Sequence, residues 1–133
     1  MRVIIPAKYS RVATYLRDGS GILYHLKEYA DRYELEVITN LSFDRESLGL
    51  TKRQLKSFFR EVTVIGGSKK KGENHITFEP RRPLKVTVRF TEGELSLIRE
   101  VATKRGTSLA DFIRFHAVDG AFELTRSERR GAE

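Results

Sequence analysis

The chain has 133 residues, lacks cysteine and tryptophan, and carries 25 Lys and Arg against 18 Asp and Glu, for a net charge of +7. Without cysteine it has neither disulfides nor thiolate metal sites, which favours a reducing, cytoplasmic compartment. No segment reaches the ~20 apolar residues of a membrane span, and the opening apolar run is too short for a signal peptide. We therefore expect a soluble protein without a membrane partner.

The positive charge is concentrated in the central third of the sequence. Residues 52–89 contain 11 Lys and Arg but only three Glu, and the rest of the chain is close to neutral. This distribution suits a polyanion, and nucleic acid fits better than a membrane surface because no basic helix with a large apolar face accompanies it. A basic surface that is merely solvated is the alternative.

The first forty residues predict a mixture of strands and helices. The run RVIIP at 2–6 is expected to form a short strand or an ordered arm, and 8–18 a helix that ends at the DGSG of 18–21. Apolar residues of 22–30 share one helical face and predict a second helix. The alternation in ELEVITN at 34–40 predicts a strand.

A basic helix is predicted next. Thr51 and Gln54 form a capping box, so the helix should begin at Thr51 or Lys52. Helical spacing predicts that its buried side comprises Leu55, Phe58, Phe59 and Val62. The cations on its other faces are candidate DNA phosphate contacts: Lys52, Arg53, Lys56 and Arg60.

A β-hairpin is predicted after this helix, with strands at 62–65 and 75–78. Its connection contains Lys69, Lys70 and Lys71, which are candidate phosphate contacts or a solvated loop. With a short helix expected near DRESLG at 44–49, the order of elements resembles a winged helix-turn-helix. A small α+β domain with a basic loop would have the same pattern, so we expect an α+β domain over 1–79 with the winged helix as one option.

The segment EPRRPL marks the expected domain boundary, and we place a linker at 80–83. Its two prolines remove backbone donors and favour extended conformations of the residues before them. Arg81 and Arg82 keep the linker hydrated and are further candidate phosphate contacts.

From residue 84 onward the sequence predicts a strand and two helices. In KVTVRF, the apolar side chains of Val86, Val88 and Phe90 share one strand face. The other face carries Lys85, Thr87 and Arg89. A capping box of Thr91 and Glu94 begins the first helix directly afterwards, and Gly106 suits the position that follows its end.

The second helix is expected to begin at Thr107 or Ser108, with Asp111 near its positively polarised end. The apolar positions of both helices include Leu95, Ile98, Phe112 and Ile113. The last residues, 125–133, are expected to be a disordered tail. A unit of about forty residues buries too little apolar surface to fold alone, and its single strand would have two open edges, so we expect it to dimerise.

The segment 84–124 resembles the ribbon-helix-helix repressors, the class of the Arc and methionine repressors. The resemblance rests on the alternation in KVTVRF, the acidic helix start TEGEL, the RGTS turn and the run SLADFIRF. It implies an α+β protein in which two protomers pair their strands into an antiparallel ribbon that enters the major groove. Lys85, Thr87 and Arg89 would contact bases, and the backbone N–H groups of Thr107 and Ser108 would bind a phosphate.

The resemblance also implies the dimer core and the function. The core would comprise Val86, Val88, Phe90, Leu95, Ile98, Phe112 and Ile113. We expect a homodimeric repressor or regulator, associated with the nucleoid, that binds double-stranded DNA at a symmetric operator, with assembly beyond the dimer left open. Plasmid partition, copy control and relaxosome assembly are alternative uses of such a protein. An antitoxin and an RNA-binding protein are alternatives from other classes.

We expect no enzymatic activity, because the sequence contains no P-loop, nucleophile elbow, zinc-protease motif or dinucleotide fingerprint. Glu34 and Glu36 share a strand face, but surface strands often carry such pairs. His25, His75 and His116 have no metal-ligand spacing. No metal, cofactor or small-molecule ligand is therefore predicted.

Overall fold

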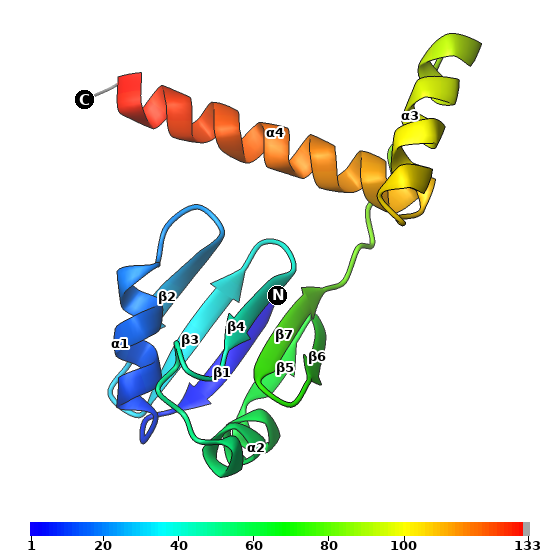
Figure 1. The fold of residues 1–133 in the computed structure, drawn as a ribbon. Helices are drawn as coiled ribbons and strands as arrows, with labels where there is room; N and C mark the ends of the chain where they lie inside the picture. Colours follow the sequence, from blue (N-terminus) through cyan, green and yellow to red (C-terminus); the bar gives the residue numbers. More distant parts are fainter. Residues whose placement is uncertain (132–133) are drawn as a thin grey trace. The chain divides into compact units, whose positions relative to one another are not determined.

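The computed structural model describes residues 1–131 and has a mixed α+β fold (Figure 1). The chain divides into two compact units, Met1–Leu84 and Lys85–Glu133. The expected linker at 80–83 immediately precedes this division. Among the described residues, no helix combines the length and apolarity that crossing a membrane would require.

The first unit contains two antiparallel sheets and two helices (Figure 1). Its elements in chain order are β1 (Arg2–Pro6), α1 (Ser10–Asp18), β2 (Tyr24–Glu28), β3 (Arg32–Val37), β4 (Leu41–Asp44), α2 (Lys52–Glu61), β5 (Thr63–Ile65), β6 (Gly67–Lys71) and β7 (His75–Pro80). One sheet has the strand order β2-β3-β1-β5 and the other the order β4-β7-β6. The predictions of β1, α1, β3 and α2 are confirmed.

One apolar core joins both sheets and both helices of this unit. Val3 of β1 lies opposite Leu35 of β3, and both side chains are fully buried. Leu16 of α1, Phe58 of α2 and Phe78 of β7 are buried in the same cluster. The first unit therefore has a core of its own.

The helix predicted over 22–30 is wrong, because β2 occupies this stretch. Tyr24 and Leu26 are buried whereas His25 and Lys27 are exposed, which is the alternation of a strand with one covered face. Leu26 fits the helical and the strand pattern equally well. Pairing with β3, in which Leu26 lies opposite Leu35, decides in favour of the strand.

Two further predictions for this unit are wrong. Residues 45–49 form a turn after β4 rather than a short helix. The predicted partners 62–65 and 75–78 do not pair with each other, since β5 pairs with β1 while β6 pairs with β7. The three lysines therefore lie in strand β6 and not in a loop. Without a helix between β4 and α2, the winged helix-turn-helix interpretation does not hold.

The second unit contains the helices α3 (Glu92–Lys104) and α4 (Leu109–Gly131). Thr91 and Glu94 form the predicted capping box. At the end of α3, Gly106 has a φ of +69° and donates to the Thr103 carbonyl, and Thr107 donates to the Ala102 carbonyl. This pair of bonds is a Schellman motif, which glycine favours because a side chain disfavours positive φ.

Two expectations for the second unit differ from the structure. Helix α4 continues to Gly131, so residues 125–131 are helical and not a disordered tail, while 132 and 133 lie outside the described residues. Residues 84–90 form no strand in the single chain. A strand requires a hydrogen-bonded neighbour, and the one expected from the sequence would belong to a second copy.

Candidate nucleic-acid interface

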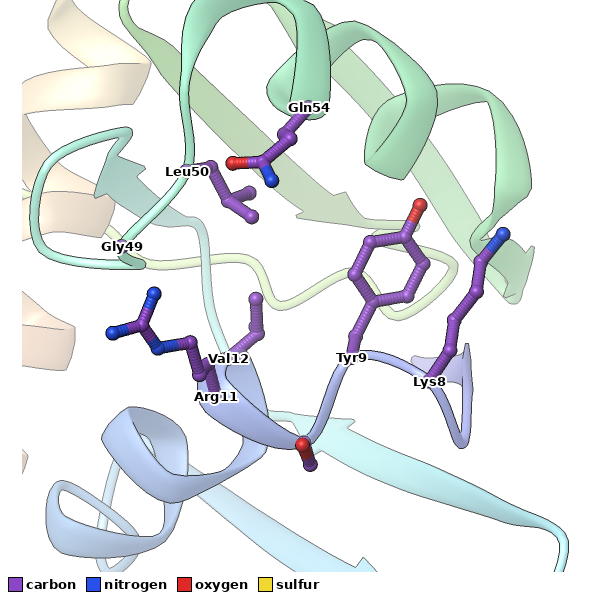
Figure 2. A pocket seen from close by; sticks show the side chains of 8 residues that line it. Lys8, Tyr9, Arg11, Val12, Gly49, Leu50 and Gln54 are labelled. Carbon is purple, nitrogen blue, oxygen red and sulfur yellow. The ribbon is translucent and has the colours of Figure 1, made fainter.

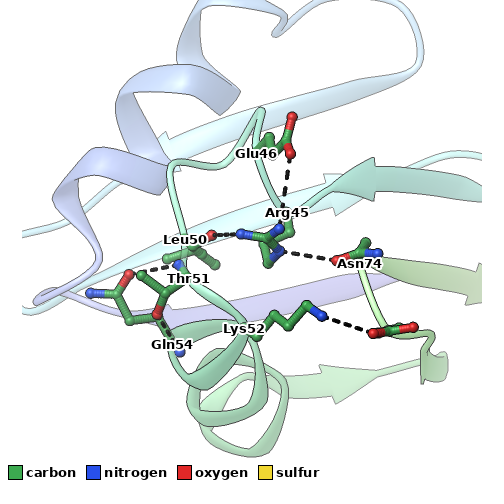
Figure 3. Close-up of polar contacts among 8 residues, drawn as sticks. Arg45, Glu46, Leu50, Thr51, Lys52, Gln54 and Asn74 are labelled. Atoms are coloured by element: carbon green, nitrogen blue, oxygen red, sulfur yellow. Dashed lines mark hydrogen bonds and ion pairs between the residues drawn. The ribbon is translucent and has the colours of Figure 1, made fainter.

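The start of α2 is held by two networks of polar contacts (Figure 3). The Thr51 hydroxyl accepts from the Gln54 N–H at 3.1 Å, and the Gln54 side chain accepts from the Thr51 N–H at 2.9 Å. Arg45 donates to the Leu50 carbonyl at 3.1 Å and to the Asn74 side chain at 3.2 Å. Arg45 thereby ties the loop before α2 to the turn between β6 and β7.

Helix α2 presents cations on the side opposite its buried residues. Leu55 and Phe58 are buried against the core. Arg53, Lys56 and Arg60 are exposed, and at about 100° per residue they fall within an arc of roughly 60° that is directed away from the core. We call these three side chains the α2 cationic face.

The acidic residues near α2 are already paired. Glu73 accepts from Lys52 at 2.8 Å, and Glu79 lies 3.2 Å from Lys70. Glu61 accepts from Lys8 at 3.0 Å and from the Tyr9 hydroxyl at 2.7 Å. The acids of this region therefore form their hydrogen bonds and ion pairs with cations outside the α2 cationic face, although the charge of Arg60 also helps to lower the pKa of the adjacent Glu61 carboxyl.

The Tyr9, Lys8 and Glu61 cluster carries two pKa shifts. Burial and the Glu61 carboxylate raise the pKa of the Tyr9 hydroxyl to about 12. Hydrogen bonds from Lys8 and Tyr9 hold the pKa of the Glu61 carboxyl below its ordinary value. The cluster links the loop before α1 to the end of α2 and stabilises the charged form of Glu61. Sequence reasoning missed it, because no spacing rule connects residues more than fifty positions apart.

The three consecutive lysines have three different environments. Lys69 donates to the carbonyl oxygens of Phe59 and Val62 at the end of α2, and its ammonium lies 4.8 Å from the centre of the Phe59 ring. Lys70 pairs with Glu79. Lys71 is exposed and donates only to the adjacent Gly72 carbonyl among the described contacts. Lys70 and Lys71 are both exposed, and Lys71 is the one of the three predicted phosphate contacts that is exposed without an ion pair among the described residues.

The two linker arginines also differ. Arg82 donates to the Asn40 side chain at 2.7 Å and so fixes the chain after β7 to the loop before β4. The Arg81 backbone N–H donates to Gly66 while its side chain is exposed. Arg81 therefore remains available to an anion, and Arg82 already has an acceptor.

The segment 84–90, which we call the ribbon segment, exposes both of its predicted faces. Leu84, Val86 and Val88 have exposed fractions of 90%, 84% and 61%. Lys85 and Arg89 are also exposed, and their side chains form no ion pair or hydrogen bond within the described part of the chain. Thr87 is exposed as well. The predicted base-contacting residues are thus accessible, next to an apolar face that the single chain does not cover.

The helices of the second unit bury little surface. Between 85 and 128, Ala102 is the one fully buried side chain, whereas the first unit buries a cluster of 17. The predicted core residues of the helices are all only half-buried, namely Leu95, Ile98, Phe112 and Ile113. Phe90 is 37% exposed. The apolar surface of this unit is therefore incomplete as a core.

The predicted phosphate-binding amides are not equivalent. The Thr107 N–H donates to the Ala102 carbonyl at 3.0 Å and is not free, contrary to the sequence-based expectation. The Ser108 hydroxyl caps α4 by accepting from the Asp111 N–H at 3.1 Å. Asp111 also forms an ion pair with Arg114, which therefore has a structural partner. The Ser108 amide is the candidate that remains at this turn.

An open pocket of about 260 Å³ lies between the start of α1 and the loop that leads to α2 (Figure 2). Arg11 and Gln54 approach it from opposite sides, and Lys8 and Tyr9 form one end. Gln54 is occupied in the capping box, and Lys8 and Tyr9 both donate to Glu61. The sequence did not predict this pocket, since it depends on how residues 8–12 meet residues 49–54.

The residues considered for metal binding or catalysis do not converge. Glu34 pairs with Arg32 at 3.1 Å, and Glu36 lies 3.4 Å from Lys27. Within the described residues, no three His, Cys, Asp or Glu side chains are grouped as metal ligands would be.

Comparisons of the chain with protein-family models, with curated proteins and with solved structures gave no match.

Proposed function

We propose that the protein is a homodimer that binds duplex DNA in a sequence-specific manner and regulates transcription at a two-fold symmetric site. The observation that carries this proposal is the ribbon segment. It alternates apolar and cationic or hydroxyl side chains, exposes both sets, and is followed directly by a capped helix. Pairing with the same segment of a second copy would cover the apolar face and supply the missing strand neighbour.

The opposite face of the paired segment would carry the base contacts. Arg89 and Lys85 can donate to the O6 and N7 atoms of guanine, and Thr87 can form a hydrogen bond or contact a thymine methyl group. A two-stranded antiparallel ribbon fits the width of the major groove. Because the two strands are related by a two-fold axis, the preferred site is expected to be an inverted repeat.

The incomplete core of the second unit supports the same assembly. With one fully buried side chain between 85 and 128, this unit lacks the apolar burial that a stable small domain requires. A second copy would bring its own Val88 and Phe90 against the half-buried residues of α3 and α4. The Ser108 amide, at the start of α4, would then contact a phosphate beside the ribbon.

The proposal is tested by determining the oligomeric state and the preferred sequence together. Sedimentation velocity of the full-length protein should give a dimer at micromolar concentration. Selection from random duplex DNA should enrich one inverted repeat with the wild type and lose that enrichment with Arg89→Ala. A folded monomer, or a selection that returns no motif, would overturn the proposal.

A further inference from the structure

The α2 cationic face lies in the first unit and has no role in the ribbon. We propose that it is a second DNA contact, which binds the phosphate backbone of the duplex without reading its sequence. This inference rests on the proposed DNA-binding function and deepens it, because it gives the first unit a share in binding. Its residues are Arg53, Lys56 and Arg60, carried by a helix that the core and the capping box hold in place.

The α2 cationic face has no ion-pair partner among the described residues. Glu61, Glu73 and Glu79 are the acids between 52 and 89, and each is bonded to a cation outside the α2 cationic face. In the part of the chain that the structure describes, no ion pair involves Arg53, Lys56 or Arg60. A single-sign surface of this kind is complementary to a polyanion and not to a surface of mixed charge.

Arg53 lies at an electrostatically unfavourable position on the helix. The N-terminal turn of a helix carries a partial positive charge, so a cation there is unfavourable and an acid is favourable. The first turn of α2 contains Lys52 and Arg53 and no acid. Lys52 is compensated by Glu73, but Arg53 is not. A residue that opposes helix stability at an exposed position is expected to serve binding instead.

The α2 cationic face fits duplex DNA better than a single strand or a membrane surface. Arg53 and Arg60 are separated by about 10 Å along the helix axis, over which a duplex presents several phosphates because it carries one per ≈1.7 Å. Binding of single strands requires aromatic rings on which bases stack. The aromatic residues of α2 do not provide them, since Phe58 is buried and Phe59 is half-buried beneath the Lys69 ammonium. The face also lacks apolar residues that could enter a membrane.

The experiment compares two full-length double variants that remove the same charge. R53Q/R60Q removes two members of the α2 cationic face. R2Q/R11Q is the control, because Arg2 and Arg11 are exposed arginines of the same unit and form no ion pair within the described residues. Binding is measured by fluorescence anisotropy between 50 and 200 mM NaCl, with the selected duplex, a random duplex and a single strand of the same length.

If α2 binds phosphates, R53Q/R60Q will weaken binding to both duplexes by the same factor and leave their ratio unchanged. The slope of log K against log salt will fall by roughly 0.9 for each phosphate that the variant no longer neutralises. Its midpoint of thermal unfolding should change little, because removing Arg53 from the first turn relieves the helix dipole while removing Arg60 from the last turn loses a favourable interaction with it. The single variant R53Q provides the same comparison with the smallest change to the helix.

Three results would overturn the inference. These are an unchanged salt slope in R53Q/R60Q, an equal reduction of affinity in R2Q/R11Q, and a greater reduction on the single strand than on the duplex. Failure of the proposed function has a different outcome. In that case the wild type would not prefer the selected duplex over the random one, while R53Q/R60Q would still weaken binding to both.

Discussion

Lys69 closes the C-terminal end of α2 by donating to the carbonyl oxygen of Phe59 over 2.6 Å. The last carbonyls of a helix have no partner within the helix, and a cation there also interacts favourably with the helix dipole. The same ammonium donates to Val62 and lies over the Phe59 ring. Lys69, which the sequence left as either a phosphate contact or part of a solvated loop, thus connects β6 to α2.

Replacing Lys69 by alanine is expected to lower the free energy of unfolding by about 1–3 kcal/mol, because two carbonyl oxygens would no longer have a charged donor. Lys71→Ala is the matched control in the same strand, and its effect should stay within about 0.5 kcal/mol since Lys71 is exposed. Urea denaturation followed by circular dichroism measures both. Equal effects of the two substitutions would show that the contacts of Lys69 do not stabilise the fold.

Glu61 should make stability depend on pH at the acid end. Its pKa is held below the ordinary value of 4.5 by Lys8 and Tyr9, so the charged form is favoured in the folded state. The stability that it contributes is therefore present above pH 4.5 and is lost as the pH falls through the folded pKa. We expect the difference in unfolding free energy between wild type and Glu61→Gln to be constant from pH 8 to pH 6 and to shrink below pH 4.5.

The control for Glu61 is Glu46→Gln, because the Glu46 side chain is 88% exposed and lies 3.9 Å from Arg45. Its difference from the wild type should stay small at every pH. Chemical denaturation in a series of buffers provides the measurement. If the Glu61→Gln difference were the same at pH 3.5 and pH 7, the cluster with Lys8 and Tyr9 would not be coupled to folding.

Gly106 and Gly120 should respond in opposite directions to alanine. A Cβ on either glycine would enter open space, so packing does not separate them. Gly106 has a φ of +69°, a conformation that costs an L-residue roughly 1–2 kcal/mol, and Gly106→Ala should destabilise by that amount. Gly120 lies within α4, where Gly120→Ala should stabilise by about 0.5–1 kcal/mol. Thermal unfolding of both variants shows whether each substitution stabilises or destabilises the protein. Destabilisation by both would contradict the helical conformation of Gly120 as the reason for the difference.

Local signals predicted the ends of helices well. The capping boxes of Thr51 with Gln54 and of Thr91 with Glu94 depend on side chains three residues apart, and both form as expected. Gly106 follows the end of α3 because its positive φ suits glycine, which is also a property of the local sequence. Such motifs satisfy backbone groups within one turn, so distant parts of the chain do not change them.

Strand pairing could not be predicted in the same way. Val64 pairs with Val3 of β1, although the strand around Ile76 is nearer in the sequence and fits a hairpin pattern. Leu26, which pairs with Leu35, fits both the helical and the strand pattern of apolar residues. Both outcomes depend on which strand edge is available in the folded unit. The same limit applies to the candidate site, since the sequence KKK does not reveal that Lys69 binds α2, Lys70 binds Glu79 and Lys71 is accessible.

Val88→Asp is expected to abolish the proposed dimer, because pairing of the ribbon segments would bury an unpaired carboxylate. Thr87→Asp is the matched control, since it introduces the same side chain at the adjacent position on the opposite strand face. It should leave the dimer intact and prevent DNA binding by placing negative charge against the duplex. Sedimentation velocity measures the oligomeric state of both variants. A dimer that survives Val88→Asp would exclude the ribbon as the interface.

Arg89 is expected to carry sequence discrimination. It is exposed, and its side chain forms no ion pair or hydrogen bond among the described residues. In the proposed ribbon it would occupy the strand face opposite Val88. If it donates to a guanine in the major groove, Arg89→Ala will weaken binding to the selected duplex by roughly 1–3 kcal/mol and relax preference at one base position of each half-site. Binding to a random duplex will change less, because the hydrogen bonds to that guanine do not form there.

The control for Arg89 is Arg99→Ala, which removes the same charge from an exposed position on α3. Titration of both variants with every single-base substitution of the selected site separates the two kinds of effect. Loss of preference at one position in Arg89→Ala alone would assign that base to Arg89. A uniform reduction of affinity in both variants would mean that Arg89 contributes only charge, and the ribbon would then bind the duplex without reading it at this position.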